Sequence, residues 1–163
     1  MVERLYAPWR EEFILGPKSD ECIFCDPDSR PHVRELILHR GRHNFIVLNR
    51  YPYNSGHLMI VPYRHIAQLD CLKTAERNEM FALVTLSSVI LHEQMNPDGI
   101  NVGMNIGRAA GAGIADHLHV HIVPRWAGDT NFMPALFETR VTSVDLGKLC
   151  RQLRAAFRKK AKA

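Results

Sequence analysis

Residues 116–126 read Asp-His-Leu-His-Val-His-Ile-Val-Pro-Arg-Trp, and the rest of the chain is best understood from this stretch. Three histidines alternate there with three aliphatic residues: His117, Leu118, His119, Val120, His121 and Ile122. Because successive side chains of a β-strand point to opposite faces, the alternation predicts a strand with one aliphatic and one imidazole face. The aliphatic face can be buried, whereas three unpartnered histidines are costly to bury and are expected to look into a cleft. Pro124 cannot donate to a ladder, so we expect it at the strand end or an edge.

The alternative is a surface strand with incidental histidines, which the preference of strands for β-branched and aromatic residues disfavours. The segment holds three of the nine histidines in the chain. It also follows a glycine-rich loop, residues 107–113, and glycines allow a backbone to approach phosphate closely. Together the loop and the strand predict a phosphate-binding site.

The composition is that of a single globular domain. The chain has 163 residues, of which 46% are hydrophobic, and this argues against disorder. We assign one domain to residues 1–163, with an N-terminal arm at 1–20 and a basic helix end at 151–163. No apolar run is long enough to cross a bilayer, and the N-terminus lacks the apolar core of a signal peptide, so we expect a cytoplasmic protein.

The net charge of +4 is unevenly distributed. Residues 151–163 carry six Lys or Arg and no acidic residue, whereas the other residues carry 15 Lys or Arg and 17 Asp or Glu. The basic excess therefore belongs to a solvated helix end and has no aromatic interleaving, which argues against a specific nucleic-acid module. A weak contact of this end with polyphosphate or RNA remains open.

The order of elements predicts an α+β fold with a five-stranded antiparallel sheet and two main helices. Three strands of a meander come first, followed by a helix, two more strands and a second helix. The expected strands are residues 35–39, 43–49, 57–62, 100–105 and the histidine strand, and the expected helices are residues 74–95 and 144–159.

The first of these helices has the clearest pattern. Met80, Leu83, Val84 and Leu91 recur at helical spacing and are expected to face the sheet. Thr74 is the expected N-cap.

The four cysteines do not form a disulfide framework of the kind found in secreted proteins. Cys71 and Cys150 stand alone and are expected to serve in packing. Cys22 and Cys25 form a C-x-x-C pair. Such a pair supplies half of a tetrahedral zinc site, but it is also compatible with a redox-active or a reduced, metal-free pair.

The histidine strand also predicts a chemistry. A neutral imidazole can attack phosphorus and form a phosphoramidate, which water or another acceptor then resolves. Such a site needs donors for the phosphate oxygens, and candidates lie in or beside the glycine-rich loop: Asn105, Gly111 and Gly113. Aromatic and aliphatic candidates for a base pocket are Ile23, Phe24 and Phe45; Trp126 is a candidate to stack a base, with surface packing or a dimer contact as alternatives.

These motifs resemble the histidine triad (HIT) family, whose signature is His-x-His-x-His followed by two apolar residues, here residues 117–123. The resemblance extends to residues 43–50, 56–62 and 124–129. Within the family, the segments from Asn49 to His57 and from Pro124 to Asp129 look most like the fragile-histidine-triad branch and its bacterial relatives. That branch acts on dinucleoside polyphosphates.

The resemblance implies a HIT-like fold and an enzyme that cleaves substrates such as diadenosine tetraphosphate through a nucleotidyl-histidine intermediate. It makes His119 the nucleophile, His121 a phosphate contact, His57 a second imidazole beside the phosphate and Asn49 a ribose contact. Without the resemblance, His57 and Asn49 read as residues at strand ends. Two alternatives remain, a nucleoside phosphoramidase of the same family and a non-catalytic nucleotide-binding sensor. The resemblance also implies a homodimer formed through the long helix and an edge strand.

One position departs from the branch. Its members carry a Gln four residues before the first histidine of the triad, and this chain has Gly113 there. The missing amide puts plain hydrolysis in doubt, and the added room can admit inorganic phosphate as the acceptor. A phosphorylase is therefore a hypothesis beside a hydrolase.

The resemblance also completes the metal site. Related HIT proteins and the galactose-1-phosphate uridylyltransferases have two similar cysteines, together with a histidine after the Ile-Val-Pro strand and the first histidine of the triad. The corresponding residues here are Cys22, Cys25, His65 and His117. This set is expected to hold a structural Zn²⁺.

Overall fold

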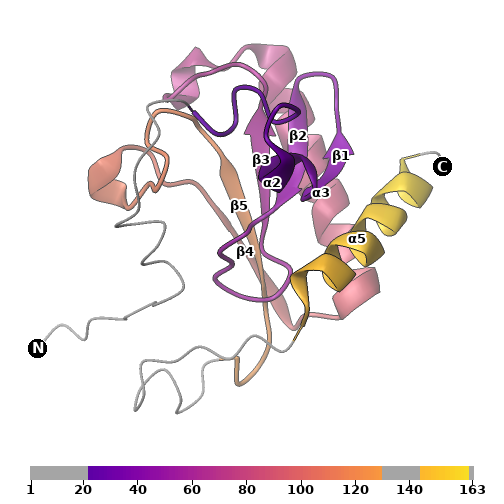
Figure 1. Cartoon of the computed structure of the whole chain (residues 1–163). Coiled ribbons are helices and arrows are strands. Elements are labelled where there is room, and N and C mark those ends of the chain that lie inside the picture. The colour runs from indigo at the N-terminus through magenta and orange to yellow at the C-terminus, as the bar shows by residue number, and fades with distance from the viewer. Residues whose placement is uncertain (1–21, 130–143, 162–163) are drawn as a thin grey trace, which may run out of the picture.

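The computed structural model describes residues 22–129 and 144–161, which contain one antiparallel sheet with the strand order β1-β2-β3-β5-β4 (Figure 1). Its strands are β1 (Ile37–Arg40), β2 (Asn44–Leu48), β3 (Leu58–Pro62), β4 (Gly99–Gly103) and β5 (Val120–Arg125). The helices are α2 (Pro31–Arg34), α3 (Thr74–Met95) and α5 (Leu146–Lys160), with short 3-10 turns η2 (Leu69–Cys71) and η3 (Arg108–Ala110). The five-stranded α+β architecture with two substantial helices is confirmed.

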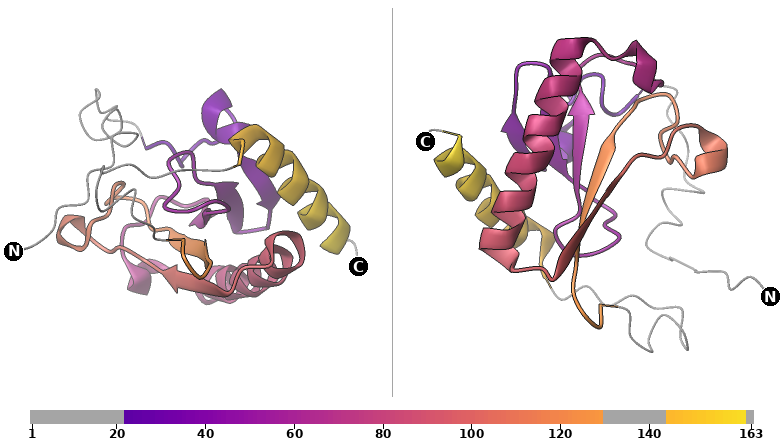
Figure 2. Two further views of the ribbon diagram at one scale, coloured as in Figure 1. Left: turned by 90° about the horizontal axis from the view of Figure 1, so that it is seen from below. Right: turned by 180° about the vertical axis from the view of Figure 1, so that it is seen from behind.

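Helices α3 and α5 pack on the same face of the sheet, as Figure 2 shows from behind. The alternating strand residues Ile46, Leu48 and Ile60 share one buried cluster with Leu83 of α3 and Leu153 of α5. The residues that alternate with these on β2 and β3 point to the other face and form a second buried cluster: Phe45, Val47, Met59 and Val61. Phe24 and Val33, which precede the sheet in the chain, belong to the same cluster. The sheet thus separates a helix-covered core from a face that the segment before β1 covers.

The aliphatic face of the histidine segment is confirmed, because Leu118, Val120 and Ile122 all lie in the helix-side core. The expected strand is too long at its start, since β5 begins only at Val120. The register pairs Ile60 with Val120, so continuing the ladder by two residues would bring Leu118 opposite Pro62. Proline has no N–H to donate, and the Leu118 N–H instead bonds to the carbonyl of Ile66 at 2.6 Å.

The expectation that all three imidazoles look into a cleft is wrong for His117. Its side chain is fully buried, and its Nε2 lies 2.8 Å from the carbonyl oxygen of Pro62. The same proline that ends the ladder therefore offers an unused acceptor to this ring. His117 consequently stands apart from the two histidines that follow it.

Helix boundaries agree with the sequence except in local details. Helix α3 spans the expected residues, but its N-cap is Lys73 rather than Thr74, and the Lys73 N–H bonds to the Glu76 carboxylate at 2.7 Å. The second helix begins at Leu146, where Asp145 accepts a hydrogen bond from the Lys148 N–H, and not at Val144.

Helix α2 was not expected. It is a single turn that begins with Pro31, a residue well suited to a first helical position. Because this turn continues to Arg34, with Glu35 as its C-cap, strand β1 starts at Ile37 rather than Glu35. The proposed N-terminal arm at residues 1–20 lies outside the described residues. None of the helices in the described ranges has the length and apolar character of a membrane span.

The carboxylate of Glu79 on α3 stabilises the turn between β1 and β2 by hydrogen bonds. Glu79 accepts hydrogen bonds from the backbone N–H groups of Arg42, His43 and Asn44 at 2.6, 2.7 and 2.8 Å, and from the Asn44 amide at 2.8 Å. The turn fits closely, because a Cβ on Gly41 would lie 2.7 Å from Glu79 Oε1. Burial raises the pKa of Glu79, but these hydrogen bonds outweigh burial and hold it below its ordinary value of 4.5.

We expect Glu79→Ala to lower the free energy of unfolding by about 2 kcal/mol or more, because it leaves several turn N–H groups without their acceptor. Urea unfolding followed by circular dichroism measures the change. The matched control is Glu93→Ala, which removes an exposed carboxylate paired with Lys160 and should change stability by less than about 0.5 kcal/mol. Equal effects of the two variants would contradict the proposed role of Glu79.

The same carboxylate predicts a pH dependence. Its pKa is lower in the folded than in the unfolded chain, so its contribution is present above pH 4.5 and is lost as the pH falls below that value. Wild type should therefore lose more stability than Glu79→Ala as the pH is lowered from 6 to about 3. Unfolding curves collected across this range test the difference.

Candidate functional site

A cavity of 440 Å³ opens on the sheet face opposite α3 and α5. Its volume falls within the range of small-molecule sites. One part of its lining is apolar: Ile23, Phe24, Val33, Leu36, Val47 and Met59. The other part is polar and includes Asn49, His119 and His121. The arrangement suits a ligand with one flat apolar end and one charged end.

The His119 ring is buried and oriented by the backbone. Its Nδ1 lies 2.8 Å from the carbonyl oxygen of His117. A carbonyl oxygen can only accept, so Nδ1 carries the proton and Nε2 of the neutral ring keeps its lone pair. Burial lowers the pKa of His119, which favours this neutral form. His119 is therefore arranged as a nucleophile or a base.

The other cavity histidine, His121, belongs to a series of hydrogen bonds in which its Nδ1 accepts, whereas Nδ1 of His119 donates. The backbone N–H of Tyr53 donates to Nδ1 of His57 at 3.1 Å. In neutral His57 the proton must then sit on Nε2, which lies 2.9 Å from Nδ1 of His121. When His121 is also neutral, its own proton is on Nε2. The ring centroids of His119 and His121 are 4.7 Å apart, so two rings that are protonated on different nitrogens are neighbours at the cavity.

Asn49 connects this chain to the loop that follows β2. Its amide nitrogen lies 3.3 Å from Nδ1 of His57, and its amide oxygen accepts from the Tyr51 N–H at 2.9 Å. Asn49 also lines the cavity. Sequence reasoning missed the neighbouring lining residues Tyr51 and Tyr53, although both lie inside the segment that carries the resemblance.

Several expected ligand-binding residues lie elsewhere. Gly113 lines the cavity, but its lining within the described ranges does not include Asn105, Gly111 or Trp126. The Asn105 amide instead bonds to the Gly111 carbonyl at 3.4 Å, which closes the glycine-rich loop on itself. Trp126 Nε1 donates to the carbonyl of Asn96 at 3.2 Å.

Phe45 also lies outside the lining. It is fully buried, and its ring packs against Phe24 at a centroid distance of 6.4 Å. It therefore supports the apolar wall of the cavity from behind.

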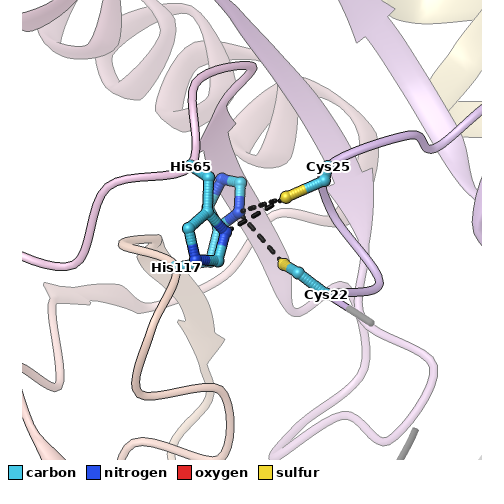
Figure 3. A group of neighbouring side chains, drawn as sticks. All are labelled: Cys22, Cys25, His65 and His117. Carbon is cyan, nitrogen blue, oxygen red and sulfur yellow. Dashed lines mark hydrogen bonds between the residues drawn. The ribbon is translucent and has the colours of Figure 1, made fainter. Parts of the chain in front are cut away.

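Beside the cavity, the four expected metal ligands converge, as their side chains show in Figure 3. Their donor atoms all lie within 4.8 Å of one another. Cys22 Sγ is 3.1 Å from Nδ1 of His117, and Cys25 Sγ is 3.1 Å from Nδ1 of His65 and 3.8 Å from Nδ1 of His117. Tetrahedral bonds of 2.0–2.3 Å to zinc imply donor separations of about 3.3–3.8 Å. The residues present therefore fit a tetrahedral metal ion.

The protonation of this group also suits a metal. The bond to Pro62 places the proton of neutral His117 on Nε2, so the lone pair of Nδ1 points toward the sulfurs. Burial lowers the pKa of His117 to about 4, so the ring is in the neutral form that binds metals. Desolvation and the adjacent Cys22 raise the pKa of Cys25 to about 11, and a bound cation would offset the cost of ionising both thiols.

Comparisons with known proteins agree with this geometry. A family model described as the HIT domain matches residues 30–128. An AP-4-A phosphorylase of Mycobacterium tuberculosis is 36% identical over 153 residues, covering 86% of this chain and 76% of that protein. A bis(5'-adenosyl)-triphosphatase of Saccharomyces cerevisiae is 32% identical over 95 residues, covering 58% of this chain and 46% of that protein.

Solved structures show the same fold. A zinc-bound histidine triad family protein from Mycobacterium smegmatis superposes with a TM-score of 0.70 at 24% identity, covering 87% of this chain and 96% of that one. A hypothetical histidine triad nucleotide-binding protein from Sulfolobus tokodaii gives a TM-score of 0.67 at 26% identity, covering 85% and 93%.

Proposed function

Since the chain belongs to the histidine triad (HIT) family, we propose that it cleaves diadenosine polyphosphates through a nucleotidyl-His119 intermediate that inorganic phosphate resolves. The observation that carries this proposal is the orientation of His119 at the cavity, with Nδ1 bonded to a carbonyl and Nε2 left with its lone pair. The similarity to an AP-4-A phosphorylase over most of the chain supports the substrate and the acceptor.

The chemistry needs one imidazole whose Nε2 has a lone pair and a second imidazole whose Nε2 carries a proton. Nε2 of His119 attacks the phosphorus next to one adenosine of diadenosine tetraphosphate, and the P–O bond to the remaining ATP breaks. The Nε2–H of His121 lies beside this centre and can protonate the departing oxygen. Phosphate then attacks the adenylyl-His119 phosphorus and releases ADP, so that substrate plus phosphate gives ATP plus ADP.

The remaining cavity residues suit the nucleoside. The apolar wall that includes Ile23, Phe24 and Val33 can cover a base. Asn49 lines the cavity with its amide nitrogen 3.3 Å from Nδ1 of His57, and we assign it to the ribose. Gly113 brings no side chain to the cavity at the position where the fragile-histidine-triad branch has Gln, which leaves room for phosphate as the acceptor. The alternatives are a nucleoside phosphoramidase and a non-catalytic sensor. The lone pair on Nε2 of His119 and the proton on Nε2 of His121 favour catalysis over sensing.

We also propose that Cys22, Cys25, His65 and His117 hold a structural Zn²⁺. The reduced thiols that this site requires suit a cytoplasmic protein. A homodimer is supported by exposed apolar residues on the long helix and on an edge strand, Phe81 of α3 and Val102 of β4.

The acceptor is tested by analysing the products of diadenosine tetraphosphate turnover with and without inorganic phosphate. We expect ATP and ADP, and only when phosphate is present. Gly113→Gln should reduce phosphate-dependent turnover at least about tenfold, because its side chain fills the acceptor space. The matched control Gly99→Gln adds the same side chain at the start of β4, opposite Arg125 and outside the cavity lining, where nothing lies within 4 Å of a Cβ, and should behave like wild type. ATP plus AMP in either buffer would instead identify a hydrolase.

His119→Asn should bind AMP but lower turnover by about a thousandfold or more, because the amide cannot form the covalent intermediate. Calorimetric binding of AMP together with single-turnover assays separates these effects. His92→Asn, on the exposed side of α3, is the control and should keep full activity. Normal turnover by His119→Asn would remove the residue from its assigned role.

Cys22→Ser should abolish stoichiometric zinc, because three ligands remain and the substituted oxygen is a poor match for the site. Elemental analysis of protein purified without added zinc gives the metal content. Cys71→Ser, an exposed cysteine outside the group, is the control and should retain wild-type metal. Full metal content in Cys22→Ser would exclude the proposed ligand set.

A further inference from the structure

We propose that zinc and nucleoside binding are thermodynamically coupled through residues 22–25, here called the knuckle; this inference rests on the proposed nucleotide and zinc sites. The two outer residues of the knuckle, Cys22 and Cys25, belong to the metal group. The two residues between them, Ile23 and Phe24, line the cavity. One four-residue turn therefore carries metal ligands at its ends and part of the apolar wall at its centre.

The knuckle is short enough for a displacement of its cysteines to move the two residues between them. The Cys25 N–H bonds to the Cys22 carbonyl at 3.4 Å, so the knuckle closes on itself. A metal that fixes both sulfurs fixes the two intervening Cα atoms as well, because consecutive Cα atoms are about 3.8 Å apart and the turn leaves little slack. A change at the cysteines therefore reaches the cavity wall directly.

Phe24 extends this connection to the histidines. Its ring centroid lies 5.5 Å from that of His117, a metal-group residue, and 5.6 Å from that of His119, the proposed nucleophile. The side chain is only 1% exposed. Phe24 thus fills the space between the metal group and the reacting end of the cavity.

Apart from the apolar packing of Phe24 against Phe45, the knuckle makes few contacts that fix its backbone in the described part of the chain. The hydrogen bonds that connect it to the other described residues all use its two sulfurs, which contact Nδ1 of His65 and His117. Sulfur–imidazole hydrogen bonds are weak, whereas bonds from zinc to thiolate and imidazole are strong enough to order small folds. Metal occupancy should therefore add to the apolar packing in determining how firmly Ile23 and Phe24 are held.

The facing wall does not depend on the metal in this way. Val47 lies on β2 and Met59 on β3, and the antiparallel ladder pairs these two residues directly. Only the knuckle half of the apolar pocket should loosen when the metal leaves. A nucleoside would then have to order that half at the expense of its binding free energy.

Thermodynamic linkage makes the effect reciprocal: if zinc strengthens nucleoside binding by some factor, the nucleoside strengthens zinc binding by the same factor. We expect a factor of about ten or more, within the usual range of coupling between sites. The probes are Zn²⁺ and AMP, because a mononucleotide occupies the cavity without being consumed.

The first experiment uses the full-length, zinc-loaded protein. Calorimetry gives the AMP dissociation constant before and after zinc is removed by a chelator, with circular dichroism to follow the fold. A graded chelator titration of the loaded protein, with and without saturating AMP, gives the reciprocal change in zinc affinity without requiring a folded metal-free form. Equal AMP affinity in the two forms, or zinc retention that AMP does not change, would overturn the coupling.

Two substitutions locate the route. Ile23→Ala should weaken AMP binding to the loaded protein and shrink the factor by which AMP raises zinc affinity. Val47→Ala, the matched control on β2, should weaken AMP binding with and without zinc and leave the factor as in wild type. If Val47→Ala shrinks the factor as much as Ile23→Ala, the knuckle is not the route and the proposal fails.

The outcomes also separate this inference from the proposed function. AMP binding to neither form would remove the proposed nucleotide site and the coupling with it. AMP binding equally to both forms, with phosphate-dependent turnover intact, would remove the coupling alone.

Discussion

The hydrogen bond between Nε2 of His117 and the carbonyl oxygen of Pro62 sets the orientation of both neighbouring sites. Pro62 cannot extend the β3–β5 ladder, so its carbonyl is available to this ring. The bond turns Nδ1 of His117 toward the cysteines. The carbonyl of His117 then accepts from Nδ1 of His119, which leaves the opposite nitrogen of that ring with a lone pair. Two backbone carbonyls, those of Pro62 and His117, thus orient the metal-group histidine and the proposed nucleophile.

The tautomer of His121 is also set by the backbone, but here the backbone group is an N–H donor. The Tyr53 N–H sets the tautomer of His57, and His57 in turn sets that of His121. Within the described residues, the cavity lining includes no Asp or Glu that would otherwise orient an imidazole. Neutral rings ordered by peptide groups add no negative charge to the cavity, which suits a polyanionic substrate.

Local patterns predicted most of the fold, whereas the roles of His57, Asn49 and the metal group came from the resemblance to the HIT family. Alternation gave the aliphatic face of Leu118, Val120 and Ile122, and helical spacing gave the bounds of α3. The start of β5 could not be read from the same pattern, because it depends on the pairing register that brings Leu118 toward Pro62. Asn105 was chosen as an amide donor beside the glycine-rich loop and Trp126 as an aromatic ring that could stack a base, but sequence does not show that Asn105 bonds to Gly111 and Trp126 to Asn96.

The cavity consequently has two walls with different origins of stability. The sheet wall carries Val47 on β2 and His121 on β5, which both pair with β3, and its geometry follows from these ladders and from the helix-side core beneath them. The knuckle wall comes from a segment outside the sheet, and its described polar contacts all run through two sulfur atoms. The proposed metal ion at those atoms would stabilise the second wall as backbone pairing stabilises the first. Because Ile23 and Phe24 lie between the two cysteines of the metal group, a metal ion there would stabilise the one wall of the cavity that the sheet does not form.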